Sequence, residues 1–399
     1  MRDVVEIGLG KTAQRGYHLD DIAIVPSRRT RDPEDVDISW DLDAFHLELP
    51  LMASAMDGVV SPQTARIVGR LGGLAVLNLE GIWTRYEDAE SLLERIATLD
   101  KHEATREMQA IYREPIKPEL IRQRIEEIKS EPGVVAAASL TPQRVSTYYE
   151  LALEAGLDIL VIQGTVVSAE HVSMHSHALN LKEFIAEVPV PTVVGGCASY
   201  STGLHLMRTG AVGVLVGVGP GAACTTRGVL GVGVPQATAI ADVAGARSTH
   251  MLETGEYVQV IADGGMRTGG DVAKAIACGA DAVMIGSPLA RAYEAPGRGF
   301  HWGMATFHPS LPRGARVATI QNGTLQEIVS GPARENDGTF NLMGGLRTSM
   351  ATCGYQDIAE FNRAELMVAP ALQTEGKQLQ REQSIGMAAR GEAVALVAD

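Results

Sequence analysis

Short runs of apolar residues recur along the chain and alternate with longer segments that have helical spacing. Eight runs are rich in Val, Ile, Leu or Ala without strict alternation, at residues 49–56, 74–78, 134–140, 159–164, 192–196, 212–217, 258–264 and 282–286. Strands that are covered on both faces have this composition, so each run predicts a buried parallel strand. Helices are predicted between the strands, over residues 61–71, 141–155, 200–209, 236–246 and 268–278.

A glycine separates several predicted helices from the strands that follow them. Gly72, Gly156, Gly210 and Gly279 each lie between a helical segment and an apolar run. Glycine suits the end of a helix because it adopts the left-handed conformation without a Cβ penalty. Eight strands that alternate with helices predict an α/β protein. The leading architecture is a (β/α)8 TIM barrel, and a doubly wound sheet is the alternative.

Two segments fall outside this repeat. Residues 85–131 are dense in charge and have helical spacing, which predicts a helical insertion at the surface after strand two. Residues 298–340 contain glycine and proline with little periodicity, which predicts a flap after strand eight. We expect residues 1–370 to form a single barrel domain and residues 371–399 to form a polar tail.

Composition and charge narrow the class of protein. Glycine accounts for 43 of the 399 residues, which suits an architecture with many tight turns. The formal net charge of −14 argues against a nucleic-acid partner, since nucleic-acid binders usually present a basic face. No run approaches the ~20 apolar residues of a membrane span, and no signal peptide opens the chain, so we expect a cytoplasmic protein without a membrane partner. The four cysteines are too scattered for a disulfide framework or a CxxC metal site.

Candidate chemistry lies in the loops after strands six, seven and eight, because barrel enzymes act at the C-terminal ends of their strands. Residues 217–227 combine glycines, which allow backbone to approach a ligand, with Cys224, a candidate nucleophile. Asp263 ends strand seven, where a carboxylate can accept both hydrogen bonds of a ribose diol. Backbone amides at residues 264–265 and 286–287 match the usual phosphate site of barrel enzymes. The sequence thus predicts a phosphorylated nucleotide beside a cysteine.

Three other motifs carry less weight. His171 and His175 are four residues apart, but no matching carboxylate cluster accompanies them. Residues 8–12 resemble a phosphate loop, yet Val5 occupies the place of its first glycine. Residues 217–222 lack the spacing of a dinucleotide-binding fingerprint, so no Rossmann module is predicted.

Collinear motifs resemble the IMP dehydrogenase and GMP reductase family. From Tyr17 to about Asp357 they comprise Leu19-Asp20-Asp21-Ile22, Ser54-Ala55-Met56-Asp57, the cysteine loop, and residues 231–236, 261–265 and 344–347. The resemblance implies purine nucleotide substrates (GMP, IMP), a covalent thioimidate between Cys224 and C2 of the base, NADPH or NADH/NAD⁺ as cofactor, and a homotetramer. The sequence resembles a divergent branch related to IMP dehydrogenase that lacks the CBS regulatory domains. The segment after strand two is too short to contain those domains.

The resemblance also implies roles for individual residues. Thr226 is similar to the hydroxyl partner of the nucleophile, and Glu80 is a substitute candidate for the catalytic carboxylate. The implied substrate ligands are Ser54, Asp263, Gly264, Gly265, Gly286, Ser287 and Met304. The implied cofactor ligands are Gln163, Gly217 and Gly219. A monovalent cation (K⁺) is implied at the carbonyls of Gly219, Gly221 and Cys224, with the ammonium group of Lys377 as an alternative.

The two reactions of the family share this covalent intermediate. A dehydrogenase oxidises IMP to XMP with NAD⁺ and water, whereas a reductase converts GMP to IMP with NADPH and releases ammonia. Residues 286–287 and 294–297 resemble the dehydrogenases. The lack of an Arg-Tyr pair after strand eight, and of the tandem domain, resembles the reductases. We therefore favour GMP reduction from the sequence, with IMP oxidation as the alternative.

Departures from the family pattern keep a third alternative open. In this chain Leu79 replaces a family lysine, Gln163 an aspartate and Cys197 an asparagine. Ala222 replaces a phosphate-binding serine, and Gln321 or Asn322 replaces the glutamate of the reductases. These changes are compatible with a nucleotide-binding regulator that lacks turnover. The intact Cys224 and Thr226 argue against a regulator, since a site without turnover has no need of a nucleophile beside a hydroxyl.

Overall fold

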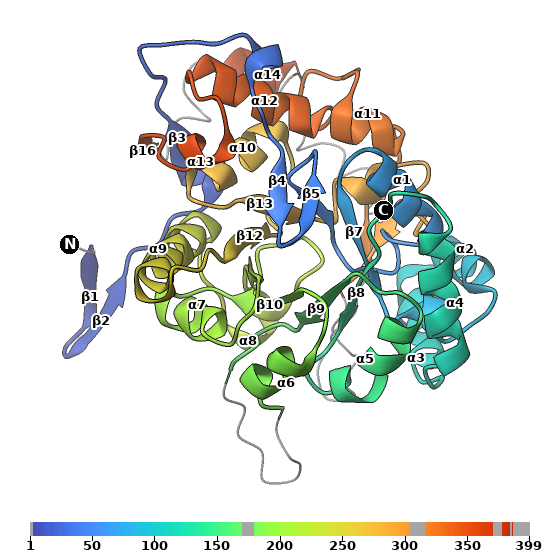
Figure 1. Ribbon diagram of the computed structural model, residues 1–399. Helices are drawn as coiled ribbons and strands as arrows, with labels where there is room; N and C mark the ends of the chain where they lie inside the picture. Colours follow the sequence, from blue (N-terminus) through green and yellow to red (C-terminus); the bar gives the residue numbers. More distant parts are fainter. Residues whose placement is uncertain (1–2, 170–178, 304–315, 370–376, 384, 386–399) are drawn as a thin grey trace.

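A closed barrel of eight parallel strands forms the centre of the molecule (Figure 1). The computed structural model describes residues 3–169, 179–303, 316–369, 377–383 and 385. In barrel order the strands are β6 (Leu51–Ala53), β7 (Leu74–Asn78), β8 (Ala137–Leu140), β9 (Ile159–Gln163), β10 (Thr192–Cys197), β11 (Gly213–Val216), β12 (Gln259–Asp263) and β13 (Ala282–Ile285). Each strand coincides with one of the predicted apolar runs, so the predicted (β/α)8 barrel is confirmed.

Each strand leads to a helix of the outer ring. In chain order these helices are α1 (Pro62–Arg70), α4 (Pro118–Lys129), α5 (Val145–Glu154), α6 (Leu181–Glu187), α7 (Tyr200–Met207), α9 (Gln236–Thr254), α10 (Gly269–Ala277) and α12 (Leu342–Thr352). Side chains of Ser61, Ser199 and Thr268 cap the first turns of α1, α7 and α10 by accepting backbone amide hydrogen bonds. Such caps satisfy donors that have no partner within the helix.

The glycines between helix and strand have the expected conformation. Gly72, Gly156, Gly210 and Gly279 have φ angles of +89°, +89°, +91° and +111°. The chain can therefore reverse from helix into strand without placing a side chain in a strained region.

The hydrophobic core fills the barrel and the space between the barrel and its helices. Every residue of β7, β8, β10, β11 and β13 is buried. Because both faces of these strands are covered, the apolar runs show no polar alternation.

The segment of residues 85–131 divides into two parts. α4 packs against α1 and α5, so it is the second helix of the ring. The insertion itself consists of α2 (Ala89–Thr98) and α3 (Lys101–Ile111), which bury Leu93, Ile96 and Met108. The insertion is therefore shorter than the predicted segment of residues 85–131, because charge density on the exposed face of a helix does not reveal what its other face covers.

The segment of residues 298–340 contains regular structure. β14 (Phe300–His301) and β15 (Val317–Ala318) form an antiparallel pair, which we call the ribbon, and α11 (Leu325–Ser330) follows it. Residues 304–315, the centre of the predicted flap, lie outside the described residues.

Elements before and after the barrel pair with one another. The pairs are β1 (Val4–Gly8) with β2 (Lys11–Gln14), β3 (Ile22–Ile24) with β16 (Leu366–Val368), and β4 (Trp40–Leu42) with β5 (Phe45–Leu47). Residues 8–12, which resemble a phosphate loop, form the turn region of the β1–β2 hairpin and open no helix. Short helices α13 (Ile358–Phe361) and α14 (Gln378–Glu382) complete the described chain. Among its described helices, none is both long and apolar enough to cross a membrane.

Candidate active site

The cysteine loop joins β11 to a short helix, α8 (Thr226–Leu230), at the C-terminal end of the barrel. Cys224 is exposed, and its Sγ lies 3.2 Å from Oγ1 of the buried Thr226. The amide of Cys224 donates to the carbonyl of Gly221 at 3.0 Å, which closes a turn in front of the thiol. The loop thus presents a thiol to solvent with a hydroxyl group as its immediate neighbour, and the expected roles of Cys224 and Thr226 stay predictions.

Arg227 braces this loop. Its guanidinium donates to the carbonyls of Val218 at 3.2 Å and Val234 at 2.6 Å. A Cβ at Gly219 would lie 2.5 Å from Cγ of Arg227. Glycine at position 219 therefore has structural reasons, since its φ is +78° and a Cβ would crowd the side chain of Arg227.

The expected monovalent-cation site stays a prediction. One of its three carbonyls, that of Gly221, already accepts the amide of Cys224. No group of three or more His, Cys, Asp and Glu side chains within the described ranges could hold a metal ion. Lys377 is half-buried, and the neighbouring residues 370–376 are outside the described part of the chain, as are His171 and His175.

Asp263 and Gln163 meet across the mouth of the barrel. Nε2 of Gln163, at the end of β9, donates to Oδ2 of Asp263, at the end of β12, at 3.2 Å. Burial raises the pKa of Asp263 to about 7, and the hydrogen bond from Gln163 acts in the opposite direction. Oε1 of Gln163 is buried and has no partner among the described residues. The expected ribose ligand and an expected cofactor ligand are thus in direct contact, with one acceptor atom left over.

The loops after β11 and β12 also touch through their backbones. A Cβ at Gly217 would lie 2.2 Å from the carbonyl oxygen of Asp263. Nε2 of Gln236 donates to that oxygen at 3.3 Å and to the carbonyl of Val216 at 2.8 Å. A Cβ at Gly265, where φ is +84°, would lie 3.1 Å from Cβ of Pro220. These contacts set the position of Asp263 relative to the cysteine loop.

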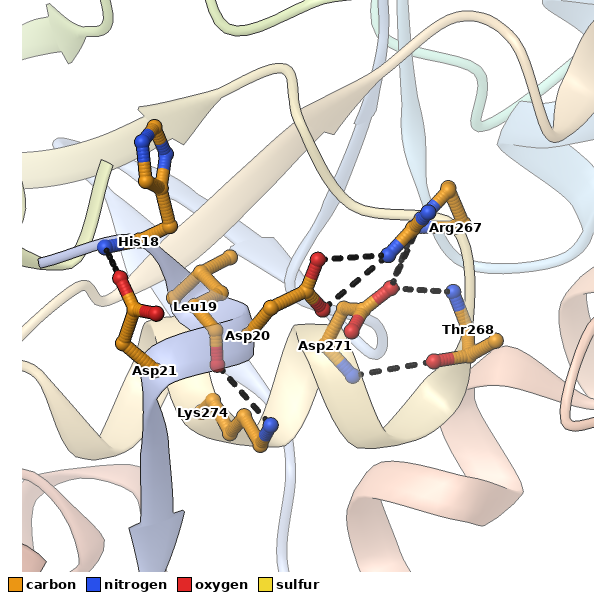
Figure 2. A network of polar contacts seen from close by, with 8 residues as sticks. All are labelled: His18, Leu19, Asp20, Asp21, Arg267, Thr268, Asp271 and Lys274. Atoms are coloured by element: carbon orange, nitrogen blue, oxygen red, sulfur yellow. Dashed lines mark hydrogen bonds and ion pairs between the residues drawn. The ribbon is translucent and has the colours of Figure 1, made fainter. Parts of the chain in front are cut away.

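A polar network holds the loop after β12 from its other side (Figure 2). Nη2 of Arg267 lies 3.1 Å from both carboxylate oxygens of Asp20, and the amide of Arg267 donates to Asp271 at 2.9 Å. Nζ of Lys274 donates to the carbonyl of Leu19 at 2.9 Å. The Leu19-Asp20 motif therefore anchors the loop that follows Asp263.

Two of the expected phosphate ligands, Gly286 and Ser287, follow β13 and lie beside Ser54, an expected substrate ligand that follows β6. A Cβ at Gly286 would lie 3.5 Å from Oγ of Ser54, which is buried. Oγ of Ser287 lies 2.7 Å from Nε2 of His301. Burial lowers the pKa of His301 to about 4, so its imidazole is neutral at pH 7. His301 is thus a site neighbour that the sequence analysis does not identify, while the expected ligand Met304 lies outside the described residues.

Glu80 lies on the far side of the barrel from the thiol, because β7 and β11 occupy opposite places in the closed strand order. Its Oε1 accepts the backbone amide of Thr141 at 2.5 Å, which ties together the loops after β7 and β8. The catalytic role of Glu80 stays a prediction, because its carboxylate is held by the loop after β8 and lies across the barrel from Cys224.

Sequence reasoning missed residues whose importance depends on distant partners. His301 and Arg227 were assigned no role, and Gln236 was noted only as part of a motif. No periodicity marks these positions, since each makes its contact only after separate loops have closed on one another. The one signal in the sequence for Arg227 is its place, as a long cationic side chain directly after the glycine-rich cysteine loop.

Comparisons with known proteins agree with this geometry. Residues 16–377 match the family model of the IMP dehydrogenase / GMP reductase domain. An uncharacterized oxidoreductase of Mycolicibacterium smegmatis is 48% identical over 374 residues, which cover 92% of this chain and 100% of that protein. The inosine-5′-monophosphate dehydrogenase of Cryptosporidium parvum is 30% identical over 383 residues, which cover 88% of this chain and 91% of that enzyme.

A solved structure extends the agreement to the fold. The crystal structure of an IMP dehydrogenase/GMP reductase-like protein from Corynebacterium glutamicum superposes with a TM-score of 0.87 at 45% identity, and the match covers 92% of this chain and 98% of that one. The barrel, the family model and these relatives lead to one conclusion: the chain belongs to the IMP dehydrogenase / GMP reductase family and is an oxidoreductase of that family.

Proposed function

We propose that this oxidoreductase forms a covalent thioimidate between Sγ of Cys224 and C2 of a purine nucleotide, and that it oxidises IMP to XMP. The observation that carries the covalent step is the exposed thiol, 3.2 Å from Oγ1 of Thr226, on a braced loop at the barrel mouth. Thr226 carries the polar group next to the sulfur, so we assign it the proton exchange that accompanies attack and release.

The nucleotide spans the loops that follow β11, β12 and β13. Asp263 is placed to accept hydrogen bonds from the ribose hydroxyls, and the backbone at Gly264 and Gly265 continues that surface. Ser54, Gly286 and Ser287 cluster where the 5′-phosphate would lie, with neutral His301 supporting the hydroxyl of Ser287. Backbone amides and hydroxyl groups suit a phosphate, because they donate hydrogen bonds without a competing negative charge.

The nicotinamide cofactor of this family fits the region around Gln163. Oε1 of Gln163 is buried without a partner in the described structure, so it can accept an N–H from a carboxamide. When bound there, NAD⁺ supplies the acceptor for the hydride. Packing alone explains why positions 217 and 219 are glycine, so glycine there is not evidence of a cofactor contact. We assign these two residues to the cofactor because their loop carries the thiol.

The proposed reaction balances as IMP + NAD⁺ + H₂O → XMP + NADH + H⁺. Sγ bonds to C2 as hydrogen leaves that carbon with its electron pair. The oxygen of water then bonds to C2, the C–S bond breaks and the thiol recovers its proton. We assign this proton movement to Thr226, because it lies beside the sulfur, whereas Glu80 lies across the mouth and is assigned no part in it.

Two observations reverse the preference for GMP reduction that the sequence favours. The Cryptosporidium dehydrogenase aligns over 91% of its own length with 88% of this chain, so short length does not favour a reductase. In addition, Nε2 of Gln321 donates to the carbonyl of Ala292 at 2.8 Å. An amide held in this way cannot protonate the departing ammonia as the reductase glutamate does, and Asn322 has the same limitation.

GMP reduction is the second candidate. Its balance is GMP + NADPH + 2 H⁺ → IMP + NADP⁺ + NH₄⁺. The observation in its favour is that no Arg-Tyr pair follows strand eight in the sequence, so the usual means of activating water is missing. Glu80 would then have to supply the proton to ammonia from the opposite side of the mouth.

A pair of absorbance assays decides the direction. With IMP and NAD⁺, we expect reduced cofactor to appear, and Cys224→Ala should lower the rate by at least about 1,000-fold. Cys353→Ala, at a buried cysteine in α12's C-terminal turn, is the matched control and should retain activity. Consumption of NADPH with GMP instead would assign a reductase. Silence in both assays, with Cys224 still protected from alkylation by IMP, would assign the nucleotide-binding regulator.

A further inference from the structure

Asp57 is a buried carboxylate on the loop that also carries Ser54. It is 1% exposed, and its Oδ2 accepts hydrogen bonds from the amide of Ile82 at 2.9 Å and from the hydroxyl of Tyr112. Burial raises the pKa of Asp57 to about 6, while the hydrogen bonds from Tyr112 and Ile82 lower it. A buried carboxylate of this kind depends on its donors, because each lost donor leaves charge uncompensated.

Tyr112 connects this carboxylate to the ribbon. It is the residue that ends α3 of the insertion, and its oxygen accepts a hydrogen bond from Nε1 of Trp302 at 2.7 Å. The indole therefore donates to the phenol, and the phenol donates to the carboxylate of Asp57. Bonds aligned in one direction polarise one another, which strengthens the chain. Trp302 directly follows the ribbon strand β14.

Arg316 makes a second tie between the insertion and the ribbon. Arg316 directly precedes β15, and its guanidinium donates to the carbonyls of Ile96 and Leu99 at the C-terminal end of α2. The last carbonyls of a helix lack partners and attract a cation, so this is a favourable place for arginine. Its Cζ also lies 4.0 Å from the ring centroid of Phe300 in β14.

The ribbon needs such support. β14 and β15 contribute two residues each, and an isolated two-stranded pair of that length is not stable in water. Yet the ribbon carries His301, which meets Ser287 at 2.7 Å. Tyr112 and Arg316 therefore contact the ribbon, and the ribbon in turn contacts Ser287 at the proposed phosphate end of the site.

We propose that the α2–α3 insertion is a platform that holds the ribbon in place, with Tyr112 and Arg316 as positioning residues for the nucleotide phosphate. Through Trp302 and His301 the platform places Ser287, and through Asp57 it places the loop of Ser54. The inference rests on the proposed function only for the identity of the ligand. Phosphate contacts are made equally before and during reaction, so their loss raises KM and leaves kcat unchanged.

Tyr112→Phe tests the platform, with Tyr86→Phe as its matched control. The hydroxyl of Tyr86 donates to the carbonyl of Ile111 at 3.2 Å, so it belongs to the same region without reaching the ribbon. We expect Tyr112→Phe to raise KM and the dissociation constant for IMP about tenfold, with kcat within about twofold of wild type. Arg316→Lys, which keeps the charge but not the two-pronged donor, should shift KM in the same direction. Tyr86→Phe should match wild type.

Hydrogen exchange of the ligand-free protein separates this inference from the proposed function. Amides of residues 300–302 and 316–318 should exchange about tenfold faster in Tyr112→Phe and Arg316→Lys, while the barrel strands stay protected. Unchanged exchange in the ribbon would overturn the platform, whatever the enzyme catalyses. Faster exchange with an unchanged dissociation constant for IMP would overturn its link to phosphate binding. Failure of the wild type to turn over IMP or GMP would overturn only the proposed function.

Discussion

The buried carboxyl group of Asp263 is proposed to bind ribose, and its burial lowers the stability of the folded protein at neutral pH. Burial raises its pKa to about 7, and the hydrogen bond from Gln163 acts against this shift. An aspartate in the unfolded chain has a pKa near 4. Between these two values the folded protein holds a proton that the unfolded chain has released, so the free energy of unfolding falls as pH rises from about 4 to about 7. The carboxylate proposed to bind ribose thus costs stability at neutral pH.

Asp263→Asn should therefore stabilise the protein at pH 8, because the amide has no charge to bury. The gain should disappear toward pH 4, where the wild-type carboxyl is neutral too. Thermal unfolding across this pH range measures it, with a rise in Tm of about 1 °C for each kcal/mol gained in a chain of 399 residues. Asp35→Asn, at an exposed carboxylate, is the control without such a trend. A gain that is the same at pH 4 and pH 8 would contradict the assignment to charge burial.

At the scale of the elements, the glycines of the loops after β11 and β12 are needed for packing between these loops, apart from any contact with a ligand. Gly217 and Gly265 sit where the loops after β11 and β12 press together, with a Cβ at 217 placed 2.2 Å from the carbonyl oxygen of Asp263. Backbone cannot move aside as a flexible side chain can. From the sequence, these glycines are expected to make room for a ligand, and in the structure they also make room for the neighbouring loop.

Gly217→Ala should lower the free energy of unfolding by about 1–3 kcal/mol, because the added methyl group meets backbone. Gly228→Ala is the matched control in the same region, since a Cβ there has nothing within 4 Å. Denaturant unfolding of both variants makes the comparison. Equal stabilities for the two variants would show that the loops after β11 and β12 can separate at little cost.

At the scale of the whole molecule, the β1–β2 hairpin stands apart from the barrel (Figure 1). Val4, Ile7 and Leu9 on it are 57%, 65% and 104% exposed. The hairpin is held together by its own ladder and by an ion pair of 3.2 Å between Arg15 and Asp3.

The homotetramer implied by the family resemblance stays a prediction, which light scattering tests.

Removal of residues 3–15 should leave the Tm of the barrel within about 2 °C of the full chain. The reason is that the hairpin's ladder lies outside the closed barrel and its ring of helices. Thermal unfolding in dilute solution is the measurement, with the molecular mass checked on the same samples. A fall of several degrees at unchanged mass would mean that the hairpin supports the barrel directly.

Local signals in the sequence were sufficient for the barrel and for the thiol. Apolar runs without alternation located the eight strands, and the glycines at 72, 156, 210 and 279 located the helix ends. The motif around Cys224 located the candidate loop, whose thiol and Thr226 hydroxyl are neighbours. These features are short in range, because periodicity and turn chemistry are properties of consecutive residues.

The tertiary structure alone decided which distant residues share an environment. It assigned α4 to the ring, brought Gln163 to Asp263, and joined Asp57 to Trp302 through Tyr112. The raised pKa of Asp263 likewise comes from burial by other strands, which no segment of sequence contains. By itself, the sequence determined the barrel strands and the candidate nucleophile, since both follow from local chemistry. The platform and the electrostatics of the mouth depended on the closed barrel, because only closure brings their partners within hydrogen-bond distance.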